Sequence, residues 1–230
     1  MVRFLLVRHA ATAWTVQGRF QGQTNVPLSL HGHRQVADLA QRLRTETIHT
    51  LYASDLQRAW ETARAIAAPH ALGVQSEPRL REMAFGRWEG LTYAEMQQRD
   101  AARLAAWERD QWHIAPPEGE TLQQMTERVR AVYMSVVSVS QDKTVGLVTH
   151  GGPLQLLLCL ALGLPPQAYW QFAMAPASLS ELCVYEQGAI LTSLNDTHHL
   201  HPYPLTETEG AEQRQTRGHT IQSQRDSAET

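Results

Sequence analysis

The chain has 230 residues, of which 43% are hydrophobic, and this predicts one large globular domain with a substantial core. The formal net charge of −3 gives no electrostatic reason to expect nucleic acid or an anionic membrane as a partner. No segment reaches the length of a membrane span and the short apolar start lacks a signal cleavage site, so we expect a cytoplasmic protein. Two cysteines, Cys159 and Cys183, lie in apolar runs and are expected in the core without a disulfide.

Strands and helices are predicted to alternate along the first part of the chain. Residues 2–7 form an apolar run that ends in polar residues, as expected of a buried parallel strand. Apolar residues at helical spacing predict an amphipathic helix over residues 29–44, with Ser29 near its N-terminal cap. Residues 50–54 and 55–68 then have the patterns of a strand and a helix.

The second part of the chain continues this alternation. Thr121 and Gln124 resemble a capping box that opens a helix, and residues 144–149 form a second apolar strand. The longest apolar stretch, 154–164, is bounded by prolines and is predicted to be a buried helix, while 181–194 has the pattern of a late hairpin. This order predicts an α/β fold, a three-layer α/β/α sandwich around a mostly parallel sheet with an edge hairpin.

The composition of the chain changes after Tyr203. No aromatic residue follows, aliphatic residues are scarce, and Glu, Gln, Thr, Ser and Arg dominate. Such a stretch buries too little apolar surface to offset its ordering entropy. We therefore predict a domain over residues 1–203 and a disordered tail over 204–230, with a partner-binding tail as the alternative.

Five polar motifs follow one another in order. Arg8 and His9 come directly after the first strand, where charge is costly unless it faces a ligand crevice. The other motifs are SDLQRA (54–59), LREM (80–83), FGRWEG (85–90) and VTHGG (148–152). A lone histidine such as His9 is more often a satisfied core residue. The ordered set, however, resembles the histidine phosphatase superfamily, which contains the cofactor-dependent phosphoglycerate mutases and many small phosphomonoesterases, and the resemblance spans about residues 2–200.

This resemblance implies a site for phosphoryl transfer. It assigns His9 as the nucleophile that forms a phosphohistidine, and a neutral imidazole has the free lone pair that this step needs. It places Arg8, Arg58 and His150 on the phosphoryl group, with His150 as a cationic imidazole that stabilises the transition state. Glu82 is the candidate donor of a proton to the leaving oxygen, a role for which its surroundings must keep it protonated.

Four further residues match family positions that contact the substrate, namely Thr15, Gln21, Gly22 and Gly151. Thr15 stands where the family usually carries asparagine, and its shorter hydroxyl implies weaker phosphate affinity or a bridging water. Gly151 and Gly152 lack side-chain bulk beside His150, which would let backbone N–H groups approach the phosphate. Asn25 stands where an aspartate is frequent, and the sequence offers no functional account of that change.

Three histidines, His198, His199 and His201, lie close enough in the sequence to suggest a metal site. Histidines at the start of a polar tail are more often simply polar. The catalytic scheme needs no metal or other cofactor, because arginines and histidines supply the positive charge, and we expect none. The expected partner is a small phosphorylated metabolite, and we expect neither nucleic acid nor a membrane as a partner. Whether the protein forms a homodimer is left undecided by the sequence.

Within the family, the sequence favours a phosphatase over a mutase. Only residues 83–149 separate Glu82 from His150, which is short for a mutase. A mutase must retain a bisphosphorylated intermediate in a strongly basic pocket, whereas the expected lid, 92–119, mixes arginines with acidic residues. Two alternatives stay open: a phosphoglycerate mutase-type phosphotransferase, and a catalytically inactive module that binds a phospho-ligand.

The substrate itself stays open at this stage. Trp107, Trp112 and His113 match the substrate-side wall of family members, where aromatic rings could stack on a base or sugar, or else pack the lid against the core. The segment 195–200, NDTHHL, resembles one that is common near the end of the alpha-ribazole phosphatase-like branch, which dephosphorylates a precursor of the cobalamin lower ligand.

Overall fold

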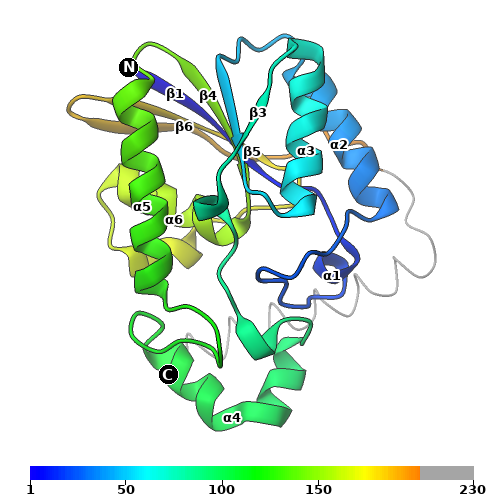
Figure 1. The fold of residues 1–230 in the computed structure, drawn as a ribbon, viewed down its shortest axis with the longest axis vertical. Helices are drawn as coiled ribbons and strands as arrows, with labels where there is room; N and C mark the ends of the chain where they lie inside the picture. Colours follow the sequence, from blue (N-terminus) through cyan, green and yellow to red (C-terminus); the bar gives the residue numbers. More distant parts are fainter. Residues whose placement is uncertain (203–230) are drawn as a thin grey trace.

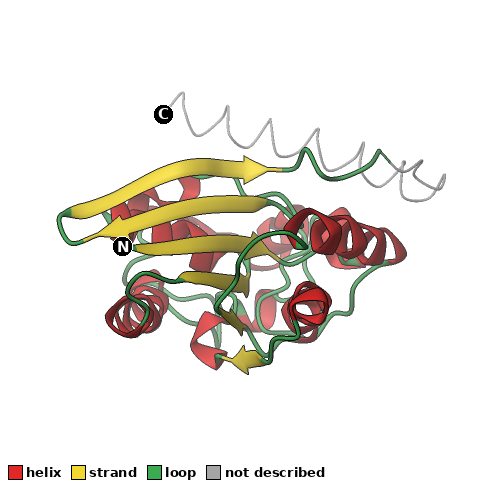
Figure 2. Ribbon diagram, turned by 90° about the horizontal axis from the view of Figure 1, so that it is seen from above, coloured by secondary structure: helices red, strands yellow, loops and turns green. Residues whose placement is uncertain are grey.

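A computed structural model describes residues 1–202, which form a six-stranded sheet between two layers of helices (Figure 1). The strands are β1 (Val2–Arg8), β2 (Thr50–Ala53), β3 (Val74–Ser76), β4 (Thr144–Thr149), β5 (Leu179–Tyr185) and β6 (Gly188–Asp196). Their order across the sheet is β3-β2-β4-β1-β5-β6, with β1 to β4 parallel and β5 and β6 antiparallel (Figure 2). The predicted tail, 204–230, lies outside the described residues.

Helices cover both faces of this sheet, with α2 and α3 on one side and α5 and α6 on the other (Figure 1). The helices and short helical turns are α1 (Ala13–Val16), α2 (Leu30–Leu43), α3 (Gln57–Ala67), η1 (Ala68–His70), η2 (Pro78–Leu80), η3 (Gly86–Trp88), α4 (Tyr93–Arg109), α5 (Leu122–Val139), α6 (Gly151–Leu162) and η4 (Pro166–Gln171). The predicted fold class, a three-layer sandwich around a mostly parallel sheet with an edge hairpin, is confirmed.

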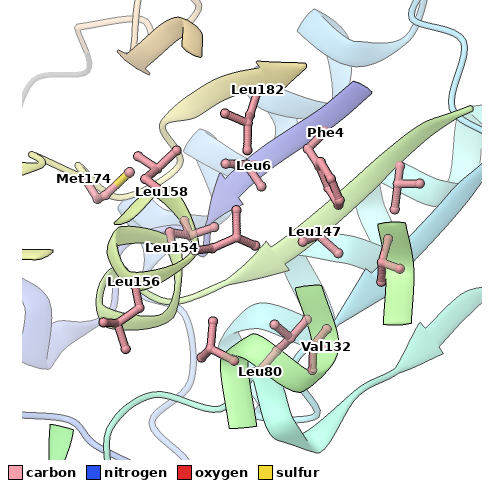
Figure 3. Close-up of a cluster of buried hydrophobic side chains, with 14 of the residues drawn as sticks. Phe4, Leu6, Leu80, Val132, Leu147, Leu154, Leu156, Leu158, Met174 and Leu182 are labelled. Atoms are coloured by element: carbon pink, nitrogen blue, oxygen red, sulfur yellow. The ribbon is translucent and has the colours of Figure 1, made fainter. Parts of the chain in front are cut away.

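The central strands are apolar throughout because both faces of the sheet are buried. Successive side chains of β1 point to opposite faces, so Phe4 and Leu6 pack with α5 and α6 (Figure 3), whereas Leu5 and Val7 pack with α2 and α3. Strand β4 repeats the pattern and is buried at every residue. Each such side chain contributes roughly 1.5–3 kcal/mol when it leaves water, which holds β1 and β4 rigidly at the centre.

The predicted helix starts are confirmed at their caps. Ser29 Oγ accepts a hydrogen bond from Gly32 N at 3.0 Å at the start of α2. Thr121 and Gln124 form a reciprocal capping box at the start of α5. Helix α3 begins at Gln57, two residues later than predicted, because the turn that follows β2 continues to its cap at residue 56.

A small subdomain lies beyond the carboxyl ends of the strands and carries α4 (Figure 1). It has its own core, in which Trp88 and Trp107 meet edge to face with ring centroids 5.6 Å apart, beside Met96 and Leu104. Trp107 is buried there, so it packs the lid rather than lining a substrate wall. The sequence did not single out α4 as a helix, since few of its residues are buried.

Neither cysteine forms a disulfide, with Cys159 buried and Cys183 half-buried. Among residues 1–202, no helix combines the length and apolar character needed to cross a membrane.

Candidate active site

The polar motifs meet because β2, β4 and β1 are neighbours in the sheet. Val148 of β4 is in register with Ala53 of β2 and Val7 of β1, so the residues that follow these strands emerge side by side. Backbone hydrogen bonds extend this alignment beyond the strands, with His9 N donating to Thr149 O at 2.8 Å. The carboxyl edge of the sheet, where open α/β folds bind ligands, therefore carries His9 and the residues beside it.

One ring nitrogen of His9 is hydrogen-bonded to the backbone, and the other is hydrogen-bonded to Arg58. Its Nδ1 donates to the carbonyl of Ala10 at 2.7 Å, which leaves the lone pair on Nε2. Arg58 Nε donates to that Nε2 at 3.3 Å. Burial, followed by the positive charges of Arg58 and Arg8, holds the pKa of His9 well below its usual range. His9 is therefore neutral near pH 7, with a lone pair on Nε2.

His150 lies beside His9, with the ring centroids 5.0 Å apart. Its Nε2 is hydrogen-bonded to Ser54 Oγ at 2.8 Å, and that hydroxyl also accepts from Leu56 N at 3.3 Å. Because Leu56 donates to it, the hydroxyl can give its own proton to Nε2, which puts the imidazole proton on Nδ1. That Nδ1 is buried and has no hydrogen-bond partner among residues 1–202, so it is available to a ligand.

The protonation of His150 differs from the cationic imidazole expected from the sequence. Burial, then the charges of Arg58, His9, Arg8 and Arg128, hold its pKa well below its usual range. His150 is therefore neutral in the ligand-free protein. A bound dianion would raise this pKa by attraction, so a cationic His150 requires the substrate to be in place.

The two predicted arginines approach from different sides. Arg58, in the first turn of α3, is fully buried and donates from Nη1 to Thr24 O at 2.8 Å and from Nη2 to Gly22 O at 2.7 Å. Burial lowers its pKa to about 10, so it remains charged near pH 7. Arg8 donates from Nη1 to Met174 O, while its Nε is buried without a partner in the described part of the chain. Both guanidiniums therefore offer positive charge to an anion at this edge.

The loop that holds Arg58 is organised by Glu89, which lies in the FGRWEG motif (85–90). Glu89 accepts hydrogen bonds from Gln23 N and Thr24 N, both at 2.9 Å, and from Phe85 N at 3.2 Å. Gly22 has a φ of +49°, and a Cβ at this position would collide with the Glu89 carboxylate. These contacts aim the carbonyls of the loop at Arg58, so Glu89 has a positioning role.

The remaining substrate-side residues contact one another. Thr15 Oγ1 accepts from Gln21 Nε2 at 3.1 Å and from Thr12 N at 3.0 Å, which closes the turn that follows β1. A direct phosphate contact from Thr15 or Gln21 stays a prediction. Asn25 now has a structural account, because its Oδ1 accepts from Gln57 N at 2.8 Å and caps α3, the helix that carries Arg58.

Glu82 lies against the N-terminus of α6. Its carboxylate accepts from Met83 N at 3.0 Å and from Gly152 N at 3.4 Å. A Cβ on Gly152 would lie 2.5 Å from Glu82 Oε1, whereas a Cβ on Gly151 would stay 3.8 Å or more from Arg8 and Glu82. Gly152 is thus the glycine that makes room for the acid. Ligand contact at Gly151 stays a prediction.

Two of the expected wall residues border a groove. Trp112 and His113 line it together with Tyr169 and Trp170, and its volume is about 360 Å³. Tyr169 donates to Gln111 Oε1 at 2.9 Å. Burial, and then the negative charge of Glu82, raise the pKa of Tyr169 to about 12.

The late histidines do not gather into one site. His198 is hydrogen-bonded to Asp196, His201 to Asp38 on α2, and His199 to the carbonyl of Ala177. Across residues 1–202, no three histidine, cysteine or acidic side chains are grouped so that they could hold a metal ion.

Comparison with known proteins places the chain in a family. Residues 4–197 match the Histidine phosphatase superfamily (branch 1), and the chain belongs to this superfamily, as its motifs predicted. It is 32% identical over 200 residues to Phosphoserine phosphatase 1 of Hydrogenobacter thermophilus, covering 87% of this chain and 95% of that protein. It is 34% identical over 214 residues to a Yersinia enterocolitica protein named Probable phosphoglycerate mutase GpmB, covering 87% and 95%. Among solved structures it resembles the Alpha-ribazole Phosphatase from Shigella flexneri, with a TM-score of 0.79, 30% identity, and coverage of 88% and 100%.

Proposed function

We propose that this protein is a phosphomonoesterase that hydrolyses a small phosphorylated metabolite through a phosphohistidine intermediate, without a metal. The observation that carries the proposal is the state of His9, a buried neutral imidazole whose Nε2 lone pair faces Arg58 and His150. A nucleophile with two guanidiniums and a second imidazole beside it suits attack on a phosphate dianion.

The reaction would run in two balanced steps. In the first, His9 Nε2 attacks phosphorus, the bond from phosphorus to the leaving oxygen breaks, and Glu82 gives its proton to that oxygen. In the second, water attacks the phosphohistidine while the Glu82 carboxylate accepts a proton from that water. The phosphorus–nitrogen bond then breaks, which restores His9 and releases inorganic phosphate.

A second candidate is phosphotransfer of the mutase type, favoured by the identity to the protein named Probable phosphoglycerate mutase GpmB. The charge of the lid favours hydrolysis. A groove at the end of the lid is lined by Glu108 and Asp110 as well as Arg109, and this mixed charge would make the lid a poor trap for a bisphosphorylated intermediate.

The test is a pair of assays on the purified full chain. We expect hydrolysis of para-nitrophenyl phosphate, acid-labile labelling of the protein by labelled substrate, and no isomerisation of 3-phosphoglycerate. His9→Ala should lose turnover and labelling, whereas His33→Ala, at an exposed position on α2, should retain both. Labelling that persists in His9→Ala would identify another nucleophile, and isomerisation at a rate equal to hydrolysis would favour the mutase.

A further inference from the structure

One arginine that the mechanism does not use makes more hydrogen bonds than any catalytic residue described above. Arg128, on α5, forms a two-pronged contact with Glu120, from Nε at 3.0 Å and from Nη2 at 2.6 Å. Its Nη1 donates to the carbonyls of Arg79 at 2.7 Å and Arg81 at 2.6 Å, and Nη2 also reaches the carbonyl of Glu82 at 3.1 Å. The guanidinium therefore binds the backbone carbonyls of the segment that leads to Glu82.

Glu120 binds the backbone on the C-terminal side of Glu82. Its Oε1 accepts from Ala84 N at 2.9 Å, and its own N–H donates to Ala84 O at 2.9 Å. The side chains of Arg128 and Glu120 are only 18% and 15% exposed, so solvent screens this pair less than a surface ion pair. Together the two residues fix the chain on both sides of Glu82.

The Glu82 side chain depends on this backbone for its place. The only hydrogen bonds that its carboxylate accepts within residues 1–202 come from the backbone N–H groups of Met83 and Gly152. No side chain holds it directly. A shift of the segment 79–84 would therefore move the carboxyl group relative to the leaving oxygen.

We propose that Arg128 and Glu120 are a positioning pair for Glu82, which they hold at the distance that proton donation to the leaving group requires. This proposal rests on the proposed function, since it needs Glu82 to act as the acid. A misplacement of about 1 Å can cost on the order of 100-fold in rate, so loss of these backbone contacts should have a large kinetic effect.

A merely structural role for Arg128 predicts a different result. Loss of an anchor between α5 and this segment would lower stability and would slow every substrate alike. Loss of acid positioning would slow substrates with poor leaving groups selectively, because para-nitrophenolate departs without protonation and an alkoxide does not. The ratio of kcat/KM for an alkyl phosphate to that for para-nitrophenyl phosphate separates the two roles.

The experiment compares Arg128→Lys with Arg130→Lys, an exposed position on the same helix. Lysine keeps the positive charge near His150 but cannot span Glu120 and three carbonyls at once. We expect Arg128→Lys to lower kcat/KM for the alkyl phosphate about 10- to 100-fold and that for the aryl phosphate less than about threefold. Arg130→Lys should leave both unchanged. If Arg128→Lys does not fold, Glu120→Gln, which keeps the arginine, carries the same comparison.

Glu82→Gln tests the acid role of Glu82 separately from the positioning role of Arg128 and Glu120. If Glu82→Gln shows the selective loss on the alkyl phosphate and Arg128→Lys adds nothing in the double variant, the positioning role is supported. Equal losses on both substrates in Arg128→Lys, or additive losses in the double variant, would overturn the positioning role alone. Absence of selectivity in Glu82→Gln itself would overturn the acid role and the clamp with it.

Discussion

Arg58 donates from Nε to His9 Nε2 over 3.3 Å, so a guanidinium holds the lone pair with which His9 would attack in the proposed mechanism. A phosphate dianion is a stronger acceptor than a neutral imidazole, so its arrival should draw this proton away from His9. In that mechanism the ligand would free the nucleophile that attacks it. The same contact also lowers the affinity of His9 for protons in the ligand-free protein.

The first prediction concerns pH. Because burial and the neighbouring Arg58 and Arg8 lower the pKa of His9, we expect its imidazole to stay neutral well below pH 6.5, the usual value. Nuclear magnetic resonance of labelled histidines in the ligand-free protein, assigned with His9→Asn, would measure this directly. A titration of His9 near pH 6.5 would contradict it.

The same lowered pKa values give stability a definite pH dependence. The unfolded chain takes up protons at His9 and His150 near pH 6.5, whereas the folded protein does so only at lower pH. The stabilisation is therefore present above pH 6.5 and is lost as the pH falls below it, by up to about 1.4 kcal/mol per pH unit for each histidine. Denaturant unfolding between pH 7 and 5 should show this slope, reduced in His9→Asn.

The second prediction concerns Ser54, which orients His150. Ser54→Ala removes the hydroxyl at 2.8 Å from His150 Nε2 and leaves a buried nitrogen without its partner. We expect kcat to fall about tenfold, in keeping with a cost of roughly 1–3 kcal/mol for such a group. Ser178→Ala is the matched control, since Ser178 is equally buried and its hydroxyl has no partner in the described part of the chain. An equal loss in both variants would argue against the orienting role.

The third prediction concerns Gly152. An alanine there would place a methyl group 2.5 Å from Glu82 Oε1, so either the acid or α6 must shift. We expect Gly152→Ala to slow alkyl phosphate hydrolysis on the order of 100-fold. Gly73→Ala, where a Cβ meets nothing within 4 Å, should behave as the parent protein does. Unchanged alkyl phosphate kinetics in Gly152→Ala would show that Glu82 does not need its present place.

The fourth prediction concerns metal ions. The positive charge in the proposed mechanism comes from Arg8, Arg58 and His150, so hydrolysis of para-nitrophenyl phosphate should be unaffected by EDTA. Vanadate should inhibit, because it can adopt the five-coordinate geometry of the transition state. Activity that disappears in EDTA and returns with Mg²⁺ or Zn²⁺ would require a different mechanism.

Local patterns in the sequence predicted the parts of the fold that depend on local chemistry. The burial of β1 and β4 on both faces leaves apolar runs, and the caps at Ser29 and Thr121 are visible because a hydroxyl must meet the first free N–H groups. The sequence patterns did not predict the short strand β3 or the helix α4. Strand β3 has only three residues, and few residues of α4 are buried.

The sequence could point to candidate residues that directly follow a strand, as His9 and His150 do, because the carboxyl edge of such a sheet is where ligands bind. The supporting contacts were not predictable, because they join distant segments. Arg128 lies on a helix and resembles a surface residue until its bonds to the backbone around Glu82 are known. Ser54 stands 96 positions from the histidine that it orients, and no spacing rule connects them.

The burial of Arg58 bears on how the enzyme responds to its own product. Its hydrogen bonds go to two carbonyls and an imidazole, and no carboxylate is bonded to it within residues 1–202. In the proposed mechanism this charge is left for an anion to neutralise, and inorganic phosphate carries the same kind of oxygen atoms as the phosphoryl group of the substrate. We therefore expect product inhibition by phosphate. The throughput of the enzyme would then fall when free phosphate is abundant and rise when it is scarce.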